Sequence, residues 1–389
     1  MPVHFWRQAG YYFSLYAVLG LVSPYLGYWL SEVMGSSGMR YALATFYATM
    51  IFVPALWGHV AFVPRNGFSA PGHWLSFGTL GAALFALGLT QISPQLPILT
   101  ACFLVLAFGV FFNALVALLE SISYQLLGSP SKFSQIRVFG SLGFMACSVV
   151  IGGTMVMSYP WTFPYLISAI MTIAWIQSLA YKTISLPSED RKKSSSIPLS
   201  HSFAKLWPVW GLVASTQAAF ACYFAFFALR MKEIGFSGPM IGVLIGLATA
   251  AEVFTFLKMG SFMSRHSPRT LILWSTALTS LRWVVLWMVA SYSWVAFLVV
   301  ALAQLTQSFG FSIFHVSTIR TLHESVPSGH FGTLRGLSEA FGFGVGGVLG
   351  VFLAGTIWEA GHHAEVFLVA SGLAFISFLF ALFLPRLDK

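Results

Sequence analysis

Long apolar runs separated by short polar turns dominate the sequence of this 389-residue chain. A helix needs about 20 predominantly apolar residues to cross the hydrocarbon core of a bilayer. The pattern predicts twelve membrane-spanning helices, at residues 8–30, 39–61, 73–94, 96–127, 130–157, 162–182, 206–232, 238–260, 268–290, 293–325, 328–357 and 364–385. Because twelve is even, we expect both termini on the same side of the membrane.

The composition supports a lipid environment. Only 8% of the residues are charged and 57% are hydrophobic, whereas a soluble domain carries about 25% charged residues. The formal net charge of +9 would indicate nucleic acid in a soluble protein, but here the basic residues cluster in short loops. We therefore expect the lipid bilayer, and no nucleic acid, as the macromolecular environment. The apolar N-terminal stretch has no small-residue cleavage site and is interpreted as the first span.

Lysine and arginine positions predict the orientation, because cytoplasmic loops carry an excess of both. With both termini cytoplasmic, sixteen basic residues fall in or near inside segments, and only Arg40, Arg230 and Lys232 fall outside. The predicted location is a cell inner membrane, spanned many times, with a chain that functions as a monomer.

One long polar segment, "SLPSEDRKKSSSIPLSHS" at 185–202, divides the spans six and six. Its charge and its Ser and Pro content are typical of a flexible linker. The predicted organisation is an N-terminal six-helix half at 1–184, a cytoplasmic linker at 185–205 and a C-terminal six-helix half at 206–389.

The two halves repeat weakly. In "FSQIR", Phe133, Ile136 and Arg137 match "FGTLR" (Phe331, Leu334, Arg335) at a constant offset of 198, and each motif opens the fifth span of its half. Parallel six-helix repeats related by an axis along the membrane normal are typical of major facilitator transporters.

Longer motifs give the same assignment. The turns "WGHVAFVPRNG" and "MGSFMSRHSPR" resemble the loop motif of the major facilitator superfamily, without its usual acidic residue. The segments "SPYLGYWL", "KFSQIRVFGSLGF", "ATAAEVFTF", "TSLRW" and "FHVSTIRTL" resemble the phenylpropionate permease and nucleoside–proton symporter group, and more distantly lactose permease. The resemblance implies an all-α membrane fold of two pseudo-symmetric halves, with substrate bound between them near the midplane.

Ionisable residues inside the predicted spans are the candidate functional groups, because each costs about 2.5–3.5 kcal/mol at the bilayer centre. They are Glu120, Arg137, Glu252, Arg282, His315 and Glu339, with the polar companions Asn113, Gln217, Gln304 and Gln307. At 1.5 Å per residue, Glu120 and Arg137 each lie about 10 Å from the turn that joins their helices. We therefore expect these two to pair across a helical hairpin.

Proton coupling is the second expectation. His315 and Glu339 each lie about 17 Å from the turn between spans ten and eleven, and histidine changes its charge near neutral pH. The resemblance to lactose permease implies that Glu120 and Arg137 bind substrate, and that Glu252 and Arg282 serve substrate binding and proton coupling. The chain departs from that pattern in span ten, where Gln307 and Gly310 replace a coupled His and Glu.

The sequence thus predicts a transporter, and not an enzyme, that moves a small organic molecule with protons by alternating access. An aromatic monocarboxylate is the favoured substrate; a sugar or nucleoside symporter or an exporter is the alternative. The substrate-binding set is Glu120, Arg137, Arg282, Asn113 and Gln307, and the proton-coupling set is Glu252, His315 and Glu339. We expect neither cofactor nor metal.

Several readings stay open. Arg137 and Arg335 could instead be arginines that reach the cytoplasmic interface, and Glu339 could neutralise Arg335 from one turn away. His315 could be a packing histidine. A membrane enzyme or a non-transporting sensor remains the alternative of another class, although the only aspartates, Asp190 and Asp388, lie in solvent segments, and no G-x-x-x-x-G-K-[ST] phosphate loop occurs.

Overall fold

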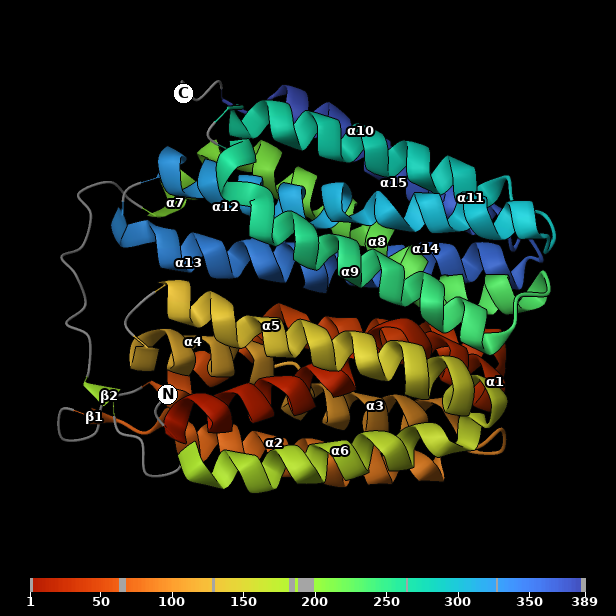
Figure 1. Ribbon diagram of the computed structural model, residues 1–389, viewed down its shortest axis with the longest axis horizontal. Coiled ribbons are helices and arrows are strands. Elements are labelled where there is room, and N and C mark those ends of the chain that lie inside the picture. The colour runs from red at the N-terminus through yellow and green to blue at the C-terminus, as the bar shows by residue number, and fades with distance from the viewer. Residues whose placement is uncertain are drawn as a thin grey trace. The chain divides into compact units, whose positions relative to one another are not determined.

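The protein is helical almost throughout (Figure 1). This computed structural model describes residues 3–62, 68–127, 130–181, 186–187, 199–263, 265–326 and 328–385. Within these ranges, eleven helices are long and apolar enough to cross a membrane.

The first of these helices contains two spans. Helix α1 (Val3–Ala61) has 59 residues, which would extend about 90 Å at 1.5 Å per residue, against a hydrocarbon core of about 30 Å. Its helical backbone is interrupted at Gly35, where φ is 74° and ψ is 175°. A positive φ of this size favours glycine, because a Cβ would be strained there. Counting α1 as two spans confirms the predicted twelve-helix fold.

The chain divides into two compact units. Unit 1 comprises Met1–Asp190 and Gly238–Val243, and unit 2 comprises Arg191–Ser237 and Leu244–Lys389. Unit 1 contains α1, β1 (Phe68–Ser69), α2 (Pro71–Gly88), η1 (Leu89–Gln91), α3 (Ile98–Phe112), α4 (Leu115–Leu127), α5 (Pro130–Ala146), η2 (Cys147–Val156), η3 (Pro160–Thr162), α6 (Phe163–Ser178), η4 (Leu179–Tyr181) and β2 (Leu186–Pro187). Unit 2 contains α7 (Leu199–Lys205), α8 (Trp207–Glu233), most of α9 (Gly238–Met263), α10 (Pro268–Trp287), α11 (Trp294–Leu305), η5 (Phe309–Ile313), α12 (Phe314–Ser325), α13 (Ser328–Glu339), η6 (Ala340–Gly346), α14 (Gly347–Glu359) and α15 (Glu365–Leu382).

The segment predicted as a linker over 185–205 contains two described elements, β2 and α7. Strand β2 pairs antiparallel with β1, and Phe68 lies opposite Pro187. This pairing joins the turn after the second span to the segment that follows the sixth. Helix α7 occupies the end of the linker, and residues 188–198 lie outside the described part of the chain.

In each unit the first span packs closely on the fifth. In unit 1, α1 lies against α5 and η2, and in unit 2, α8 lies against η6 and α14. A Cβ on Gly152 would lie 2.0 Å from a ring carbon of Tyr25, and one on Gly350 would lie 2.1 Å from the carbonyl oxygen of Ala218. These two glycines are related by the same offset of 198 as Arg137 and Arg335. The close approach indicates that these glycines allow tight helix packing in both units.

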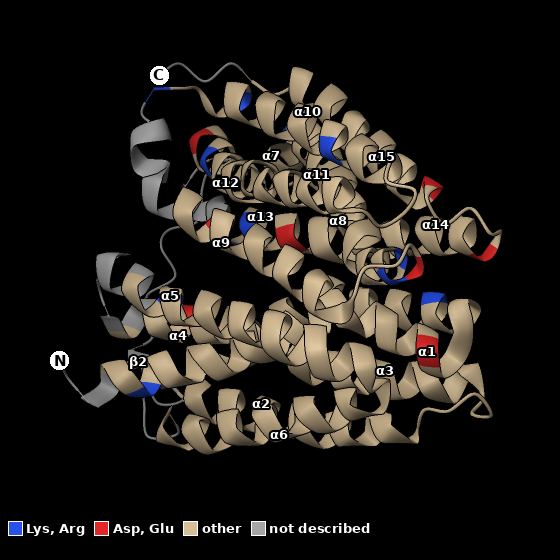
Figure 2. Cartoon of the chain, turned by 45° about the vertical axis from the view of Figure 1, so that its right-hand side comes forward, with Lys and Arg blue, Asp and Glu red and all other residues tan. Residues whose placement is uncertain are grey.

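The surface matches a hydrocarbon solvent. Large apolar side chains such as Phe52, Leu99 and Val295 are exposed, whereas Gln304, Ser312 and Ser377 are buried. Figure 2 shows how few charged residues interrupt the helices. The polar groups that do lie within spans are therefore the ones that require an explanation.

Candidate functional site

The ion pair expected in unit 1 is present. Glu120 on α4 and Arg137 on α5 form a salt bridge between Oε1 and Nη1. Their side chains are 31% and 41% exposed respectively, so the pair is neither sealed in the core nor fully hydrated. In this state the guanidinium and the carboxylate can each release the other and bind polar groups of a ligand instead.

A tyrosine completes this cluster. The hydroxyl of Tyr16 on α1 donates a hydrogen bond of 2.9 Å to Glu120 Oε1. The Arg137 guanidinium lies 5.9 Å from the centre of the Tyr16 ring, and Tyr12 stacks on that ring at 6.0 Å. Sequence analysis missed Tyr16, although its spacing of four from Tyr12 places both on one helix face.

Asn113, the other predicted binding residue of unit 1, lies elsewhere. It follows α3, and its Nδ2 donates to Thr49 Oγ1 at 2.7 Å and to the Phe46 carbonyl oxygen at 3.3 Å. These contacts tie it to the second span within α1. The described hydrogen bonds do not join Asn113 to Glu120 or Arg137.

Arg282 is the centre of a second polar cluster, in unit 2. It lies on α10 and is 3% exposed. Its Nη2 donates to Gln304 Oε1 and, at 2.7 Å, to Gln307 Oε1. Two amide oxygens thus replace the water that a guanidinium would otherwise bind.

The two glutamines extend the network to neighbouring helices. Gln304 Nε2 donates to the Tyr223 hydroxyl on α8, and Gln307 Nε2 donates to Glu252 Oε1 on α9, each at 2.7 Å. Each amide therefore accepts from Arg282 and donates to another side chain. Gln307 connects the guanidinium of Arg282 to the carboxylate of Glu252 through a single side chain.

Aromatic rings border the same guanidinium. Its central carbon lies 4.7 Å from the ring centre of Tyr223 and 4.3 Å from that of Trp283. Within the described part of the chain, Nε and Nη1 of Arg282 are buried without a hydrogen-bond partner. Buried donors without partners are costly, so these two nitrogens require an explanation.

His315 and Glu339 meet at a third place, also in unit 2. Both line a small cavity of about 20 Å³, together with Gln217, Thr318 and Arg335. That volume is sufficient for one water molecule. Arg335 forms a 2.6 Å salt bridge with Glu339, as the spacing of four predicts, so this pair neutralises itself on one helix face.

The structure therefore separates the predicted proton-coupling residues into two groups. Glu252 belongs to the Arg282 network, whereas His315 and Glu339 share the small cavity. The His315 ring stacks on Phe311 at 6.1 Å. Among the described residues, no group of three or more His, Cys, Asp and Glu side chains has an arrangement that could hold a metal ion.

Comparisons with known proteins agree with this architecture. The model of the MFS_1 like family matches residues 5–369. No curated protein sequence matches the chain. The fold is similar to two solved structures of the nucleoside transporter NupG. The structure of a point mutant gives a TM-score of 0.82 at 15% identity, and the other structure gives a TM-score of 0.79 at 16% identity. Both alignments cover 97% of this chain and 98% of the NupG chain. The POT family transporter PepTSo gives a TM-score of 0.75 at 11% identity, covering 98% and 97% of the two chains.

Proposed function

The chain belongs to the MFS_1 like family of transporters, and from this premise we propose that it carries an aromatic monocarboxylate across the membrane together with protons. The fold is that of a major facilitator transporter, and its structural neighbours are transporters and not enzymes. Substrate class, coupling ion and site residues are the proposal.

The observation that carries the proposal is the state of Arg282. Its guanidinium is buried beside the rings of Tyr223 and Trp283, and its Nε and Nη1 have no hydrogen-bond partner among the described residues. Arginine is well suited to a carboxylate, because its planar fork matches the two oxygens. The neighbouring rings favour an aromatic body attached to that carboxylate, since ring pairs contribute about 0.5–1.5 kcal/mol beyond area burial.

Glu252 is the proposed proton carrier. While it is ionised, it accepts the hydrogen bond from Gln307, which in turn accepts from Arg282. Protonation of Glu252 removes a negative charge from this end of the network and so leaves the positive charge of Arg282 more available to an anionic substrate. Substrate and proton would thus favour each other's binding, as coupling requires. His315 and Glu339, beside their water-sized cavity, are the second proposed proton-carrying pair.

Unit 1 carries a polar cluster of its own. Glu120 and Arg137 are partly exposed and are held by Tyr16. We assign Glu120 and Arg137 to substrate binding, with Gln307 as a further contact. Asn113 ranks below them as a binding residue, because its Nδ2 is already hydrogen-bonded to Thr49. We also propose cytoplasmic termini, an inner membrane location and a monomeric state.

A nucleoside is the second candidate substrate. The likeness to the nucleoside transporter NupG is below 25% identity and supports the fold alone. The buried amides of Gln304 and Gln307, however, offer the hydrogen-bonding pattern that hydroxyl and base-edge groups would need.

Binding to purified protein tests the substrate class. Phenylpropionate should raise the melting temperature, and the matching alcohol, which lacks the carboxylate, should not. Arg282→Gln should weaken phenylpropionate binding about 10- to 100-fold, because hydrogen bonds to a charged group contribute about 1.5–3 kcal/mol.

Arg265→Gln is the matched control, since Arg265 is exposed in the turn before α10. If a nucleoside raises the melting temperature and phenylpropionate does not, the result favours a nucleoside as the substrate. Undiminished phenylpropionate binding in folded Arg282→Gln protein would contradict the site.

A further inference from the structure

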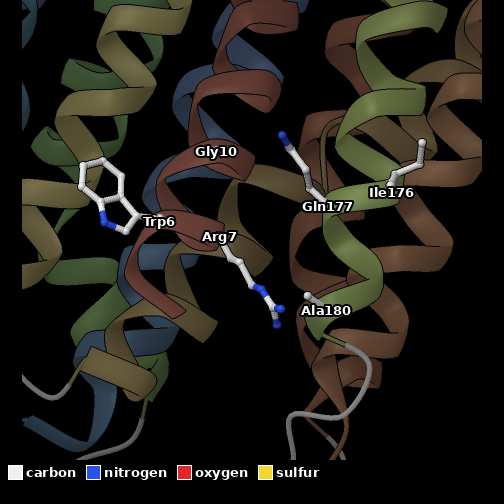
Figure 3. Close-up of a pocket in the computed structure, with 6 residues that line it drawn as sticks. All are labelled: Trp6, Arg7, Gly10, Ile176, Gln177 and Ala180. Carbon is white, nitrogen blue, oxygen red and sulfur yellow. The ribbon is translucent and has the colours of Figure 1, made fainter. Parts of the chain in front are cut away.

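A groove of about 430 Å³ lies between α1 and α6 in unit 1 (Figure 3). It is lined by Trp6, Arg7, Gly10, Ile176, Gln177 and Ala180. Figure 3 shows the Arg7 side chain extending from α1 into the space beside α6, with Gln177 on the facing helix. None of these residues belongs to either polar cluster described above.

The charge of the groove favours an anion. Arg7 supplies a guanidinium, the lining residues include no carboxylate, and the salt bridges among the described residues include none to Arg7. A Cβ on Gly10 would lie 3.4 Å from Gln177 Nε2, so the glycine leaves room for this amide against α1. Gln177 Oε1 is buried without a hydrogen-bond partner among the described residues. The groove thus presents a charged donor, Arg7, and a buried amide oxygen that lacks a donor, Gln177 Oε1.

The apolar groups place the groove at the lipid. Trp6 is 57% exposed and Ile176 is 59% exposed. Ile173 and Leu179, each three residues from Ile176, are also exposed. Tryptophan is enriched where a membrane meets water. The N-terminus of α1 lies at the end of unit 1 where β1 and β2 pair (Figures 1 and 2). An occupant would therefore have its anionic part at Arg7 and its apolar part along the helices.

From these features we infer that the groove binds the phosphate headgroup of an anionic phospholipid. Basic pockets between membrane helices bind such headgroups. Arg7 pairs with the phosphate, Gln177 Oε1 accepts a hydrogen bond from a headgroup hydroxyl such as those of glycerol, and Trp6 and Ile176 contact the glycerol and acyl chains. Free phosphate shares the charge but would leave the exposed apolar wall uncovered. This inference does not depend on the transported substrate.

Native mass spectrometry of the detergent-purified protein tests the inference, with phosphatidylglycerol, phosphatidylcholine and inorganic phosphate as separate probes. The intact protein should retain one phosphatidylglycerol in preference to the other two. Arg7→Gln should lower its apparent affinity about fivefold, as expected for one basic residue near a lipid surface. Arg265→Gln, which changes an exposed arginine outside the groove, should leave retention unchanged.

Gln177→Leu provides a second variant, because it removes the amide and keeps the side-chain volume. It should also lower phosphatidylglycerol retention while the melting temperature shows that the protein is folded. Equal retention by the intact protein, Arg7→Gln and Gln177→Leu would overturn the proposal. Inorganic phosphate that displaces the lipid at equal concentration would overturn the assignment to a lipid.

Discussion

At the scale of the residue, the central feature is a guanidinium held in an apolar interior by neutral partners. Gln304 and Gln307 solvate Arg282 without neutralising it, and Gln307 also donates a hydrogen bond to Glu252. A carboxylate bonded directly to Arg282 would neutralise the guanidinium and compete with an anionic ligand for it. Amide partners lower the cost of burial and keep the positive charge available.

Gln304→Leu should destabilise the protein by about 1–3 kcal/mol, because it removes one acceptor of Arg282 and leaves the buried Tyr223 hydroxyl without its donor. Thermal unfolding in detergent measures the change. Gln91→Leu, at an exposed position, should shift stability by less than about 0.5 kcal/mol. Equal stability of the two variants would show that the network contributes nothing to the fold.

Charge made part of this site visible in the sequence. Glu120, Arg137, Glu252 and Arg282 stand out because an ionisable group is rare and costly within a span. Tyr16, Tyr223 and Trp283 do not stand out, because aromatic residues make up 16% of the chain and most need only pack or face lipid. Which aromatic rings border a guanidinium depends on helix rotation and tilt, which hydropathy does not encode.

Among the helices, the fifth span of each half has an arginine and a packing glycine at matching positions. In unit 1 it provides Arg137 and the packing glycine Gly152, and in unit 2 it provides Arg335 and Gly350. The π-helical segments η2 and η6 follow the arginine in each case. A π segment rotates the residues beyond it relative to a regular helix, so charge and packing glycines can face different neighbours.

Gly350→Ala should lower stability by about 1–3 kcal/mol, since its Cβ would lie 2.1 Å from the Ala218 carbonyl oxygen and the helices would have to separate. Gly372→Ala, on α15, is the matched control because nothing lies within 4 Å of its Cβ. The two melting curves should therefore separate clearly. Coincident curves would mean that α8 and α14 do not need this close contact.

Helix number and type were predictable at this scale, and boundaries less so. Lipid requires every backbone polar group to be satisfied within the helix, so length and hydropathy determine the spans. The sequence did not predict the two-residue strands β1 and β2. They pair although more than a hundred residues separate them, and neither strand has a sequence pattern that indicates its partner. The π segments were missed for the same reason, as they arise from packing.

At the scale of the whole molecule, two units of six spans each carry their own polar cluster. Unit 1 holds Tyr16, Glu120 and Arg137, and unit 2 holds Arg282 with its glutamines. The repeat at an offset of 198 gave the duplication from sequence. How the units move during transport cannot be predicted from the sequence, because such motion depends on small energy differences between packed states.

The orientation proposed for the whole chain predicts a labelling pattern. In a cysteine-free background, His362→Cys lies in the turn before α15 and should react with a membrane-impermeant maleimide in intact cells. His201→Cys, on α7, should react only after the membrane is opened. Sixteen basic residues against three favour this orientation. The reverse labelling pattern would place the termini outside.

Uptake into proteoliposomes under an imposed pH gradient shows whether ionisable groups within the spans couple substrate to protons. With the acidic side outside, the intact protein should accumulate labelled phenylpropionate, and dissipating the gradient should abolish accumulation. Glu252→Gln should still exchange internal for external substrate but should not accumulate it. Accumulation by Glu252→Gln equal to that of the intact protein, or uptake indifferent to the gradient, would contradict the account.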